Sequence, residues 1–341
     1  MLLSQIESLG LTTTHQRLVI AGAVGLATIA GVVWWFRRTP KPVFKPVGKL
    51  SEIWIHPVKS CRGHQVSSAE CTPAGLYSNG LYDRYFAVLS DANRTINLGQ
   101  EPSLALIQPR ISEDGECLSL DAPGMEPLSI SLSDTAKSDN PVRAFRVWGV
   151  DAEGLDCGQE AETWLSTYLK KPNHKLVYYK EGRTKLRKPT VHSMWGKKFA
   201  SKDELRGYQD LAPLLVVTQA SLDDLNSHLE KPITMRNFRP NLVVSGANAF
   251  DEDLWKHIRI GDTVTLRRTH GCGRCKLTTV DNETGMYRSD NEPLTTLRKY
   301  RMLDKSDPDS KTLGVAPIFG SNVAYDVFGT VQVGDTVYAA V

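Results

Sequence analysis

The chain has 341 residues, of which 41 are basic and 38 acidic, and its formal net charge is only +3. This length is sufficient for about two domains, each with its own core. The basic residues form no concentrated stripe, so no nucleic-acid partner is expected. The six cysteines are dispersed, which excludes a disulfide-bonded scaffold and favours a reducing compartment.

Near the N-terminus, residues 18–36 form an uncharged apolar stretch. Its 19 residues, at about 1.5 Å each in a helix, match a hydrocarbon core of roughly 30 Å. A cleaved signal peptide is the competing interpretation, but Trp34, Trp35 and Phe36 stand where cleavage would require small residues. Paired tryptophans are typical of the membrane interface. We therefore predict a tail at residues 1–17, followed by one transmembrane helix.

The charges that flank this stretch predict its orientation. Arg17 and the terminal amine lie upstream, whereas a larger group of basic residues follows, namely Arg37, Arg38, Lys41, Lys45 and Lys49. Because an excess of basic residues stays on the cytoplasmic side, the large C-terminal part should face the cytosol. Residues 37–48 are basic and rich in proline, which predicts a semi-rigid linker beside an anionic membrane surface.

From Lys49 onward the sequence indicates strands. Short apolar runs separated by Gly, Pro, Asn and Asp predict antiparallel pairing. They lie at residues 85–89, 104–107, 117–120 and 128–132. A helix is expected at residues 160–169, where apolar side chains recur at helical spacing, and the segment 170–173 should end it. We predict a β domain over residues 49–174.

A second domain is predicted over residues 175–341. Its expected strands lie at residues 175–179, 214–217 and 242–244, and Thr218 should cap a helix whose apolar face carries Leu222, Leu225 and Leu229. The sequence IGDTV at residues 260–264 recurs as VGDTV at residues 333–337. We interpret this repeat as two equivalent strands of a β-barrel, each entered through a Gly-Asp turn and accompanied by a few helices.

The run THGCGRCKLTTVD, residues 269–281, places a thiol beside a guanidinium. The positive charge of Arg274 favours the thiolate of Cys275, which is the form that binds metals. Residues 276–280 are predicted to form a strand, which would support such a ligand rigidly. The sequence therefore suggests that this run holds a soft metal.

A single C-x-x-C pair permits other interpretations. A zinc site needs four ligands, but the remaining cysteines are scattered, at Cys61, Cys71, Cys117 and Cys157. A thioredoxin-like redox pair would begin a helix, whereas strand is predicted here. A buried structural cysteine remains open, so the motif needs support from elsewhere in the chain.

Six short motifs provide that support, and they occur in order along the chain. They are WIHPVKSC at 54–61, DRYF at 83–86, QEP at 100–102, DCG at 156–158, NFRPN at 237–241 and RCKLTTVD at 274–281. Together with the anchor, they resemble the mitochondrial amidoxime-reducing component family of molybdenum enzymes. The resemblance implies an α+β, predominantly β fold. An N-terminal β-barrel-like domain (MOSC-N) would precede a molybdenum-cofactor-sulfurase C-terminal (MOSC) β-barrel domain, after one transmembrane helix.

The resemblance also implies a molybdopterin cofactor (Mo-molybdopterin) whose metal is held by the pterin dithiolene and by one protein thiolate. Family position assigns this thiolate to Cys275 and leaves Cys272 a structural role behind it. A soft sulfur donor suits the metal. Asp210 corresponds to a family aspartate close to the metal, where it could form hydrogen bonds or transfer a proton.

A phosphorylated pterin needs cations and backbone amides around it. The resemblance assigns cofactor binding to Lys59, Ser60, Arg84, Asp210, Leu211, Ala212, Arg239, Asn241, Gly273, Arg274 and Cys275. Each basic residue alone would be read as a surface salt bridge, but their occurrence together in matched motifs favours cofactor binding. The chain departs from the family at Leu211 and Ala212, where hydroxyl residues are common, so only backbone amides could bind there.

By resemblance, the activity is the reduction of N-oxygenated compounds, namely amidoximes, hydroxylamines and N-oxides, by oxygen-atom removal at molybdenum. The electrons would come from NADH through NADH-cytochrome b5 reductase and cytochrome b5 of the outer mitochondrial type. The chain has no nucleotide-binding glycine fingerprint, which agrees with a protein donor. The implied location is the mitochondrial outer membrane, with the catalytic domain facing the cytosol.

Two other functions remain open. A membrane-tethered cofactor carrier or sulfur-transfer module would carry a persulfide on Cys275, and the MOSC fold does not exclude it. Such a carrier would not need Lys59, Ser60 and Arg84. A purely structural anchor would leave the polar motifs unexplained. The basic loop at residues 183–188 is a candidate docking segment for an acidic haem protein, although a solvated loop is the simpler interpretation.

Overall fold

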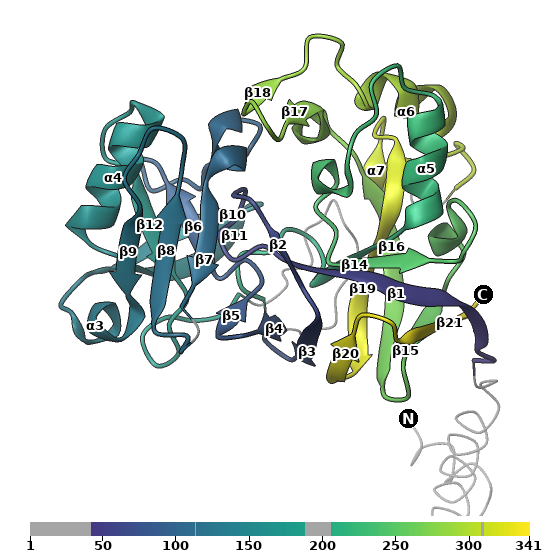
Figure 1. Cartoon of the computed structure of the whole chain (residues 1–341), viewed down its shortest axis with the longest axis horizontal. Helices are drawn as coiled ribbons and strands as arrows, with labels where there is room; N and C mark the ends of the chain where they lie inside the picture. The colour runs from purple at the N-terminus through teal and green to yellow at the C-terminus, as the bar shows by residue number, and fades with distance from the viewer. Residues whose placement is uncertain (1–41, 113, 188–205, 308–309) are drawn as a thin grey trace, which may run out of the picture. The chain divides into compact units, whose positions relative to one another are not determined.

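The computed structural model describes residues 42–112, 114–187, 206–307 and 310–341 (Figure 1). The chain divides into two units, Met1–Val43 and Phe44–Val341, and almost all described residues belong to the second. The predicted tail and transmembrane anchor, residues 1–36, lie outside the described residues. In the described part of the chain, no helix is long and apolar enough to cross a membrane.

The largest sheet has eight strands in the order β14-β13-β19-β16-β15-β21-β1-β2, and β14 also pairs with β1, which closes it into a barrel. Its strands are β1 (Lys45–Ile55), β2 (His64–Val66), β13 (Leu214–Thr218), β14 (Leu242–Ser245), β15 (His257–Ile260), β16 (Val264–Gly273), β19 (Ile318–Val327) and β21 (Thr336–Ala340). Its pairs are antiparallel except β13 with β14. The predicted barrel is therefore present.

The repeated Gly-Asp sequences have equivalent places in this barrel. β16 and β21 each begin just after one of them, and both strands pair with β15, where Ile260 lies opposite Val264 on one side and Val337 on the other. Gly261 and Gly334 have φ angles of 57° and 98°, which glycine adopts without steric cost. The interpretation of the repeat as two equivalent strands is confirmed.

Smaller sheets build the rest of the molecule. A four-stranded sheet has the order β10-β11-β12-β6, from β6 (Phe86–Leu89), β10 (Val142–Val147), β11 (Val150–Asp156) and β12 (Lys175–Tyr178). A second has the order β20-β3-β4-β5, from β3 (Ser68–Thr72), β4 (Gly75–Ser78), β5 (Leu81–Tyr82) and β20 (Gly329–Gln332). The remaining strands are β7 (Gln108–Ile111), β8 (Cys117–Asp121) and β9 (Leu128–Ser131) in one sheet, and β17 (Val280–Asp281) and β18 (Met286–Tyr287) in another.

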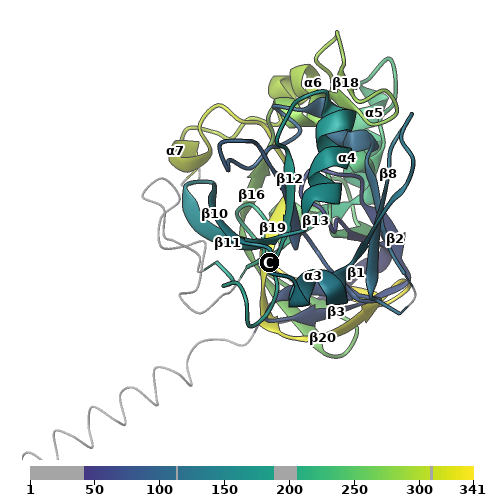
Figure 2. The ribbon, with the colours of Figure 1, turned by 90° about the vertical axis from the view of Figure 1, so that its left-hand side faces the viewer.

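Helices are few and short among the described residues. They are α3 (Leu132–Lys137), α4 (Gln159–Leu169), α5 (Gln219–Ser227), α6 (Leu294–Tyr300) and α7 (Ser310–Leu313), with 3-10 turns η1 (Pro102–Leu106), η2 (Met235–Asn237), η3 (Asp251–Asp253) and η4 (Lys276–Thr279). The predicted helix at 160–169 is α4, which packs its apolar face near β12 (Figure 2). Thr218 caps α5 as expected, since its side chain accepts a hydrogen bond from Ser221 N.

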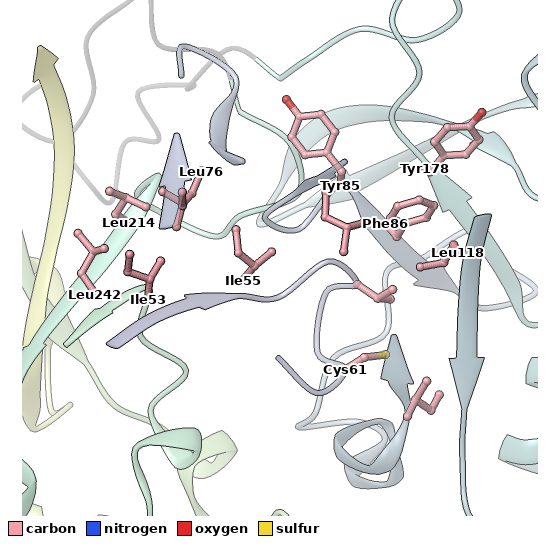
Figure 3. Close-up of a cluster of buried hydrophobic side chains, with 14 of the residues drawn as sticks. Ile53, Ile55, Cys61, Leu76, Tyr85, Phe86, Leu118, Tyr178, Leu214 and Leu242 are labelled. Carbon is pink, nitrogen blue, oxygen red and sulfur yellow. The ribbon is translucent and has the colours of Figure 1, made fainter. Parts of the chain in front are cut away.

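The two halves of the sequence are interleaved. β1, from the N-terminal half, is a barrel strand, and it begins at Lys45, inside the segment expected to be linker. β12, expected in the second domain, pairs instead with β11 and β6, while β20 pairs with β3. Figure 3 shows side chains from both halves, such as Ile53 and Leu214, in one buried cluster. The halves therefore fold against a shared core.

Two predicted strands are wrong. The apolar run at 104–107 lies mostly in η1, because Pro102 starts a turn in which Leu104 N bonds Glu101 O and Ile107 N bonds Leu104 O, both at 3.2 Å. The run at 276–280 is mostly η4. There Thr278 and Thr279 turn their hydroxyls back onto backbone carbonyls, and such local bonds replace a strand ladder.

Candidate functional site

Cys275 lies between β16 and η4, and its side chain is exposed. Its backbone is extended, with φ −131° and ψ −175°. Its carbonyl accepts hydrogen bonds from Thr278 N at 3.1 Å and from Thr278 Oγ1 at 3.0 Å. The short turn η4, rather than the expected strand, therefore fixes the backbone that carries this thiol.

Three other cysteines, Cys61, Cys71 and Cys157, are poorer candidates for a thiolate ligand because they are buried. Burial raises the pKa of Cys61 and of Cys71 to about 12 each, and also raises the pKa of Cys157 well above its usual value. These three side chains therefore stay protonated at neutral pH. Cys272 is half-buried and packs against a second apolar cluster, in agreement with its expected structural role. Across the described ranges, no group of three His, Cys, Asp or Glu side chains could hold a metal ion.

The buried side chain of Arg274 connects two backbone segments of this region. Its buried guanidinium donates to Phe319 O from Nε at 2.8 Å and from Nη2 at 2.6 Å, and to Phe238 O from Nη1 at 3.0 Å. Burial lowers the pKa of Arg274, and the Coulomb interaction with the neighbouring Cys272 and Cys275 side chains opposes this shift. The side chain thus fixes backbone, while its charge stays close to the exposed thiol.

Lys59 and Asp210 form an ion pair although they lie far apart in the sequence. Lys59 is buried in the turn after β1, and its Nζ also donates to Tyr208 O at 3.1 Å. Burial lowers the pKa of the Lys59 ammonium, which Asp210 partly offsets. Burial would raise the pKa of Asp210, but the ammonium of Lys59 holds it below its usual value. The Asp210 side chain is 47% exposed, so the carboxylate faces outward from this pair.

Arg84 and Arg239 place two positive charges within reach of each other. Arg84 pairs with the buried Asp83 and donates from Nη2 to Arg239 O at 3.3 Å. Burial, and then the charge of Arg84, lower the pKa of Arg239 to about 10. Its buried Nη2 has no hydrogen-bond partner among the described residues. Buried N–H groups are normally paired, so this donor is suited to an anion.

Five predicted site residues remain, and they have different surroundings. Asn241 links two strands, because its Nδ2 donates to Trp54 O and its Oδ1 accepts from Leu215 N, both at 3.2 Å. Gly273 lies at the end of β16, where an added Cβ would meet Ala316 Cβ at 3.2 Å. The other three are Ser60 and Ala212, which are buried, and Leu211, whose carbonyl accepts from Arg206.

The predicted residues fall into one connected region. Arg274 bonds Phe238 O, the next residue is Arg239, and the Arg239 carbonyl binds Arg84. The charge of Arg84 also lowers the pKa of Arg239, and the charge of Asp210 raises it. Ser60, Arg84 and Arg239 have φ angles of 72°, 56° and 54°. Non-glycine residues rarely adopt this left-handed region, and such residues concentrate at functional sites.

The basic loop at 183–188 is described as far as Arg187. Arg187 is buried, and its guanidinium donates to three backbone carbonyls. Arg183 donates to the carbonyls of Ala136, Ser138 and Asn140. Both arginines thus bind neighbouring backbone, Arg183 from an exposed position and Arg187 from a buried one, and the docking role of the loop stays a prediction. A run of charges gives no signal that Arg187 is buried, since such a run is typical of a solvated loop.

Two domain families match this chain. The MOSC N-terminal beta barrel domain matches residues 47–172, and the MOSC domain, which is associated with the molybdenum cofactor, matches residues 203–338. Similar curated proteins include human mitochondrial amidoxime-reducing component 1, which is 40% identical over 93% of this chain and 91% of its own length. The mouse component 1 is 40% identical over 93% of this chain and 90% of its own length. Human component 2 is 39% identical over 94% and 92%.

The chain belongs to the mitochondrial amidoxime-reducing component family. The predicted family, and the predominantly β fold with MOSC N-terminal and MOSC domains, are confirmed. The donor set described above fits the cofactor that this family implies. An exposed thiol could bind the metal, and the unpaired guanidinium N–H of Arg239 beside Arg84 could bind an anionic phosphate.

Proposed function

We propose that this protein is an oxidoreductase that depends on a molybdenum-molybdopterin cofactor and reduces N-oxygenated compounds, namely amidoximes, hydroxylamines and N-oxides. The observation that carries the proposal is the exposed Cys275 thiol on a fixed backbone, in a chain whose relatives are named amidoxime-reducing components. When bound, the cofactor supplies the two-electron chemistry that removes the substrate oxygen. Cys275 would hold the metal.

The basic residues would hold the pterin and its phosphate. Arg239 offers its unpaired Nη2, and Arg84 binds the Arg239 carbonyl. The charge of Arg84 disfavours the charge of Arg239, so a bound phosphate would offset this repulsion. Bidentate hydrogen bonding from arginine also suits phosphate geometry.

Lys59 would supply a proton to the reaction, and its partner Asp210 would orient the substrate. Reduction of an N-oxygenated group to an amine or amidine with release of water consumes two protons. Burial makes the Lys59 Nζ proton easier to release, and Asp210 Oδ1 is its hydrogen-bonded neighbour. The ionised Asp210 carboxylate would accept a hydrogen bond from a substrate N–H or O–H and would orient the substrate.

The proposal includes the electron source and the location. We infer that electrons come from NADH through NADH-cytochrome b5 reductase and cytochrome b5, because the sequence carries no nucleotide-binding fingerprint. We also infer attachment to the mitochondrial outer membrane through residues 18–36, with the catalytic part facing the cytosol. The basic residues after this stretch and the names of the relatives support this location.

Replacing the thiol tests the proposal. Purified wild-type protein, expressed with a full cofactor supply, should contain about one molybdenum per chain and should reduce benzamidoxime. Cys275→Ser should lose at least about 100-fold in turnover with an unchanged circular dichroism spectrum, because a second shell cannot replace a metal ligand. Cys272→Ser is the matched control and should retain activity. Wild-type protein that binds zinc or no metal, or full activity of Cys275→Ser, would contradict the proposal.

A persulfide carrier is the second candidate, because Cys275 is exposed and could bear a sulfur atom. A carrier would show sulfur on Cys275 by mass spectrometry and would transfer it to an acceptor. It would not require Lys59, Arg84 or Arg239 for that transfer. Loss of function when these residues are replaced would favour the reductase.

A further inference from the structure

Trp148 stands at the tip of the hairpin formed by β10 and β11. Val147 lies opposite Val150, so Trp148 and Gly149 form a two-residue turn. Their φ angles are 52° and 77°, and both are positive, as a type I′ turn requires. This turn favours Asn-Gly, whereas a bulky residue at positive φ is an outlier. A tryptophan at this position is therefore not explained by the turn itself.

Burial does not explain Trp148 either, because its side chain is 54% exposed. An exposed indole leaves a large apolar surface in water, which costs free energy. Strained and exposed residues of this kind point to a role in binding.

The tip of the hairpin is held beside Asp210. Arg187 donates to the carbonyl of Val147, the residue before Trp148, at 3.3 Å, and also to the carbonyl of Gln209, the residue before Asp210. Tyr208 strengthens this link, since its hydroxyl donates to Glu153 O at 2.8 Å and its ring lies edge-on to Phe145 with centroids 5.2 Å apart. The buried Arg187 therefore fixes the turn against the segment that carries the carboxylate.

The Trp148 side chain also contributes to the electrostatics of Asp210. Burial raises the pKa of Asp210, but the charges of Lys59 and Arg84 and a hydrogen bond from the Trp148 side chain together lower it. The indole N–H is the donor that Trp148 has. The exposed indole thus stands at a hairpin tip that Arg187 fixes next to the segment of a partly exposed carboxylate.

We propose that Trp148 determines substrate specificity by stacking on a planar, conjugated group carried by the N-oxygenated substrate, while Asp210 accepts a hydrogen bond from the substrate nitrogen. An aryl amidoxime has both parts, because its flat ring is conjugated to a carbon that bears an NH₂ donor. An indole is a large, rigid partner for such a ring. The inference rests on the proposed function and adds the substrate class, namely aromatic over aliphatic amidoximes.

Two probes test it, benzamidoxime and acetamidoxime, which share the reacting group and differ in the ring. Turnover is measured on the full chain with dithionite-reduced methyl viologen, so that no protein partner is required. Trp148→Ala should raise KM for benzamidoxime by about tenfold and KM for acetamidoxime by less than about twofold. Trp148→Phe should restore most of the preference, because it retains a stacking ring.

Binding and stability provide further readouts. Benzamidoxime should quench the tryptophan emission of the oxidised wild-type protein, and Trp148→Phe should lose that quenching. Trp148→Asn should bind benzamidoxime as poorly as the alanine variant, yet have an equal or higher melting temperature, because asparagine suits the turn. Phe328→Ala is the matched control, since it removes another exposed aromatic ring, at the turn between β19 and β20, and should change neither KM.

The outcomes separate the inference from the function on which it rests. If wild-type protein reduces benzamidoxime and Trp148→Ala changes both KM values equally, or neither, the inference is overturned and the reductase stands. Loss of pterin or molybdenum from Trp148→Ala also overturns it, because the ring would then contact the cofactor. A wild-type protein that reduces neither amidoxime overturns the proposed function, and the inference with it.

Discussion

At the scale of single residues, the site combines groups that are unfavourable without a ligand. Arg239 has a buried N–H group without a partner in the described part of the chain, and it lies beside a second guanidinium. An unpaired buried donor costs about 1–3 kcal/mol. The left-handed backbone at Arg84 and Arg239 adds to this cost. Such an arrangement is expected where a bound anion offsets these free-energy costs.

Arg239→Gln tests this view. The variant should lose most of its pterin, because a phosphate contact is gone, while the cofactor-free protein should be no less stable than wild type. Pterin content, from the fluorescence of the oxidised pterin after denaturation, and thermal unfolding of cofactor-free protein measure the two effects. Arg236→Gln is the control, since Arg236 pairs with Glu283 at the surface and should not affect pterin content. A stability loss above about 2 kcal/mol in the cofactor-free Arg239→Gln protein would indicate a structural residue instead.

At the scale of elements, hydrogen bonds around the start of α5 enclose a buried carboxyl group. Glu252 in η3 accepts from Thr218 Oγ1 and from Ser221 Oγ, each at 2.9 Å. Burial raises its pKa to about 7, and Asp253 adds to the shift. An acid whose pKa is higher in the folded state than in the unfolded state favours folding at low pH.

The unfolding free energy should therefore fall as pH rises from about 4.5 to about 7, and should then level off for this group. Glu252→Gln cannot ionise, so it should lose this slope and be more stable than wild type at pH 8. Urea unfolding at several pH values measures both effects. Asp251→Asn, on the same turn, is a control that should keep the slope. A wild-type protein whose stability rises over this pH interval at a rate that Glu252→Gln does not change would contradict the assignment.

The elements also show what local sequence can predict. Apolar periodicity is a local property, and it correctly placed α4, β13 and β14. It failed at η4, where threonines have strand propensity but bond their own backbone carbonyls. The burial of Arg187 and the pairing of Lys59 with Asp210 depend on segments that meet only in the folded molecule. Only the family resemblance brought Lys59 and Asp210 into the predicted site, and no pattern indicated that the hairpin tip at Trp148 would be held next to the segment of Asp210.

At the scale of the whole molecule, neither sequence half can form the site alone. Lys59 and Arg84 come from the N-terminal half, and Asp210, Arg239 and Cys275 come from the C-terminal half. β1 closes the barrel by pairing with both β14 and β21, so removing it would open the sheet. The core that includes Ile53 and Leu214 spans both halves (Figure 3). Chemistry and stability should therefore be lost together when the halves are separated.

The N-terminal segment, by contrast, should be dispensable for chemistry. Phe44–Val341 forms a unit of its own and contains every residue assigned to the site. Expression of residues 42–341 should give a protein that no longer sediments with membranes and that reduces benzamidoxime with an unchanged kcat when methyl viologen supplies the electrons. Its rate with membrane-bound cytochrome b5 should fall, because a shared membrane raises the effective concentration of the two partners. A truncated protein that still sediments with membranes would show that residues 18–36 are not the sole anchor. An unchanged rate with the membrane-bound donor would show that anchoring does not serve electron delivery.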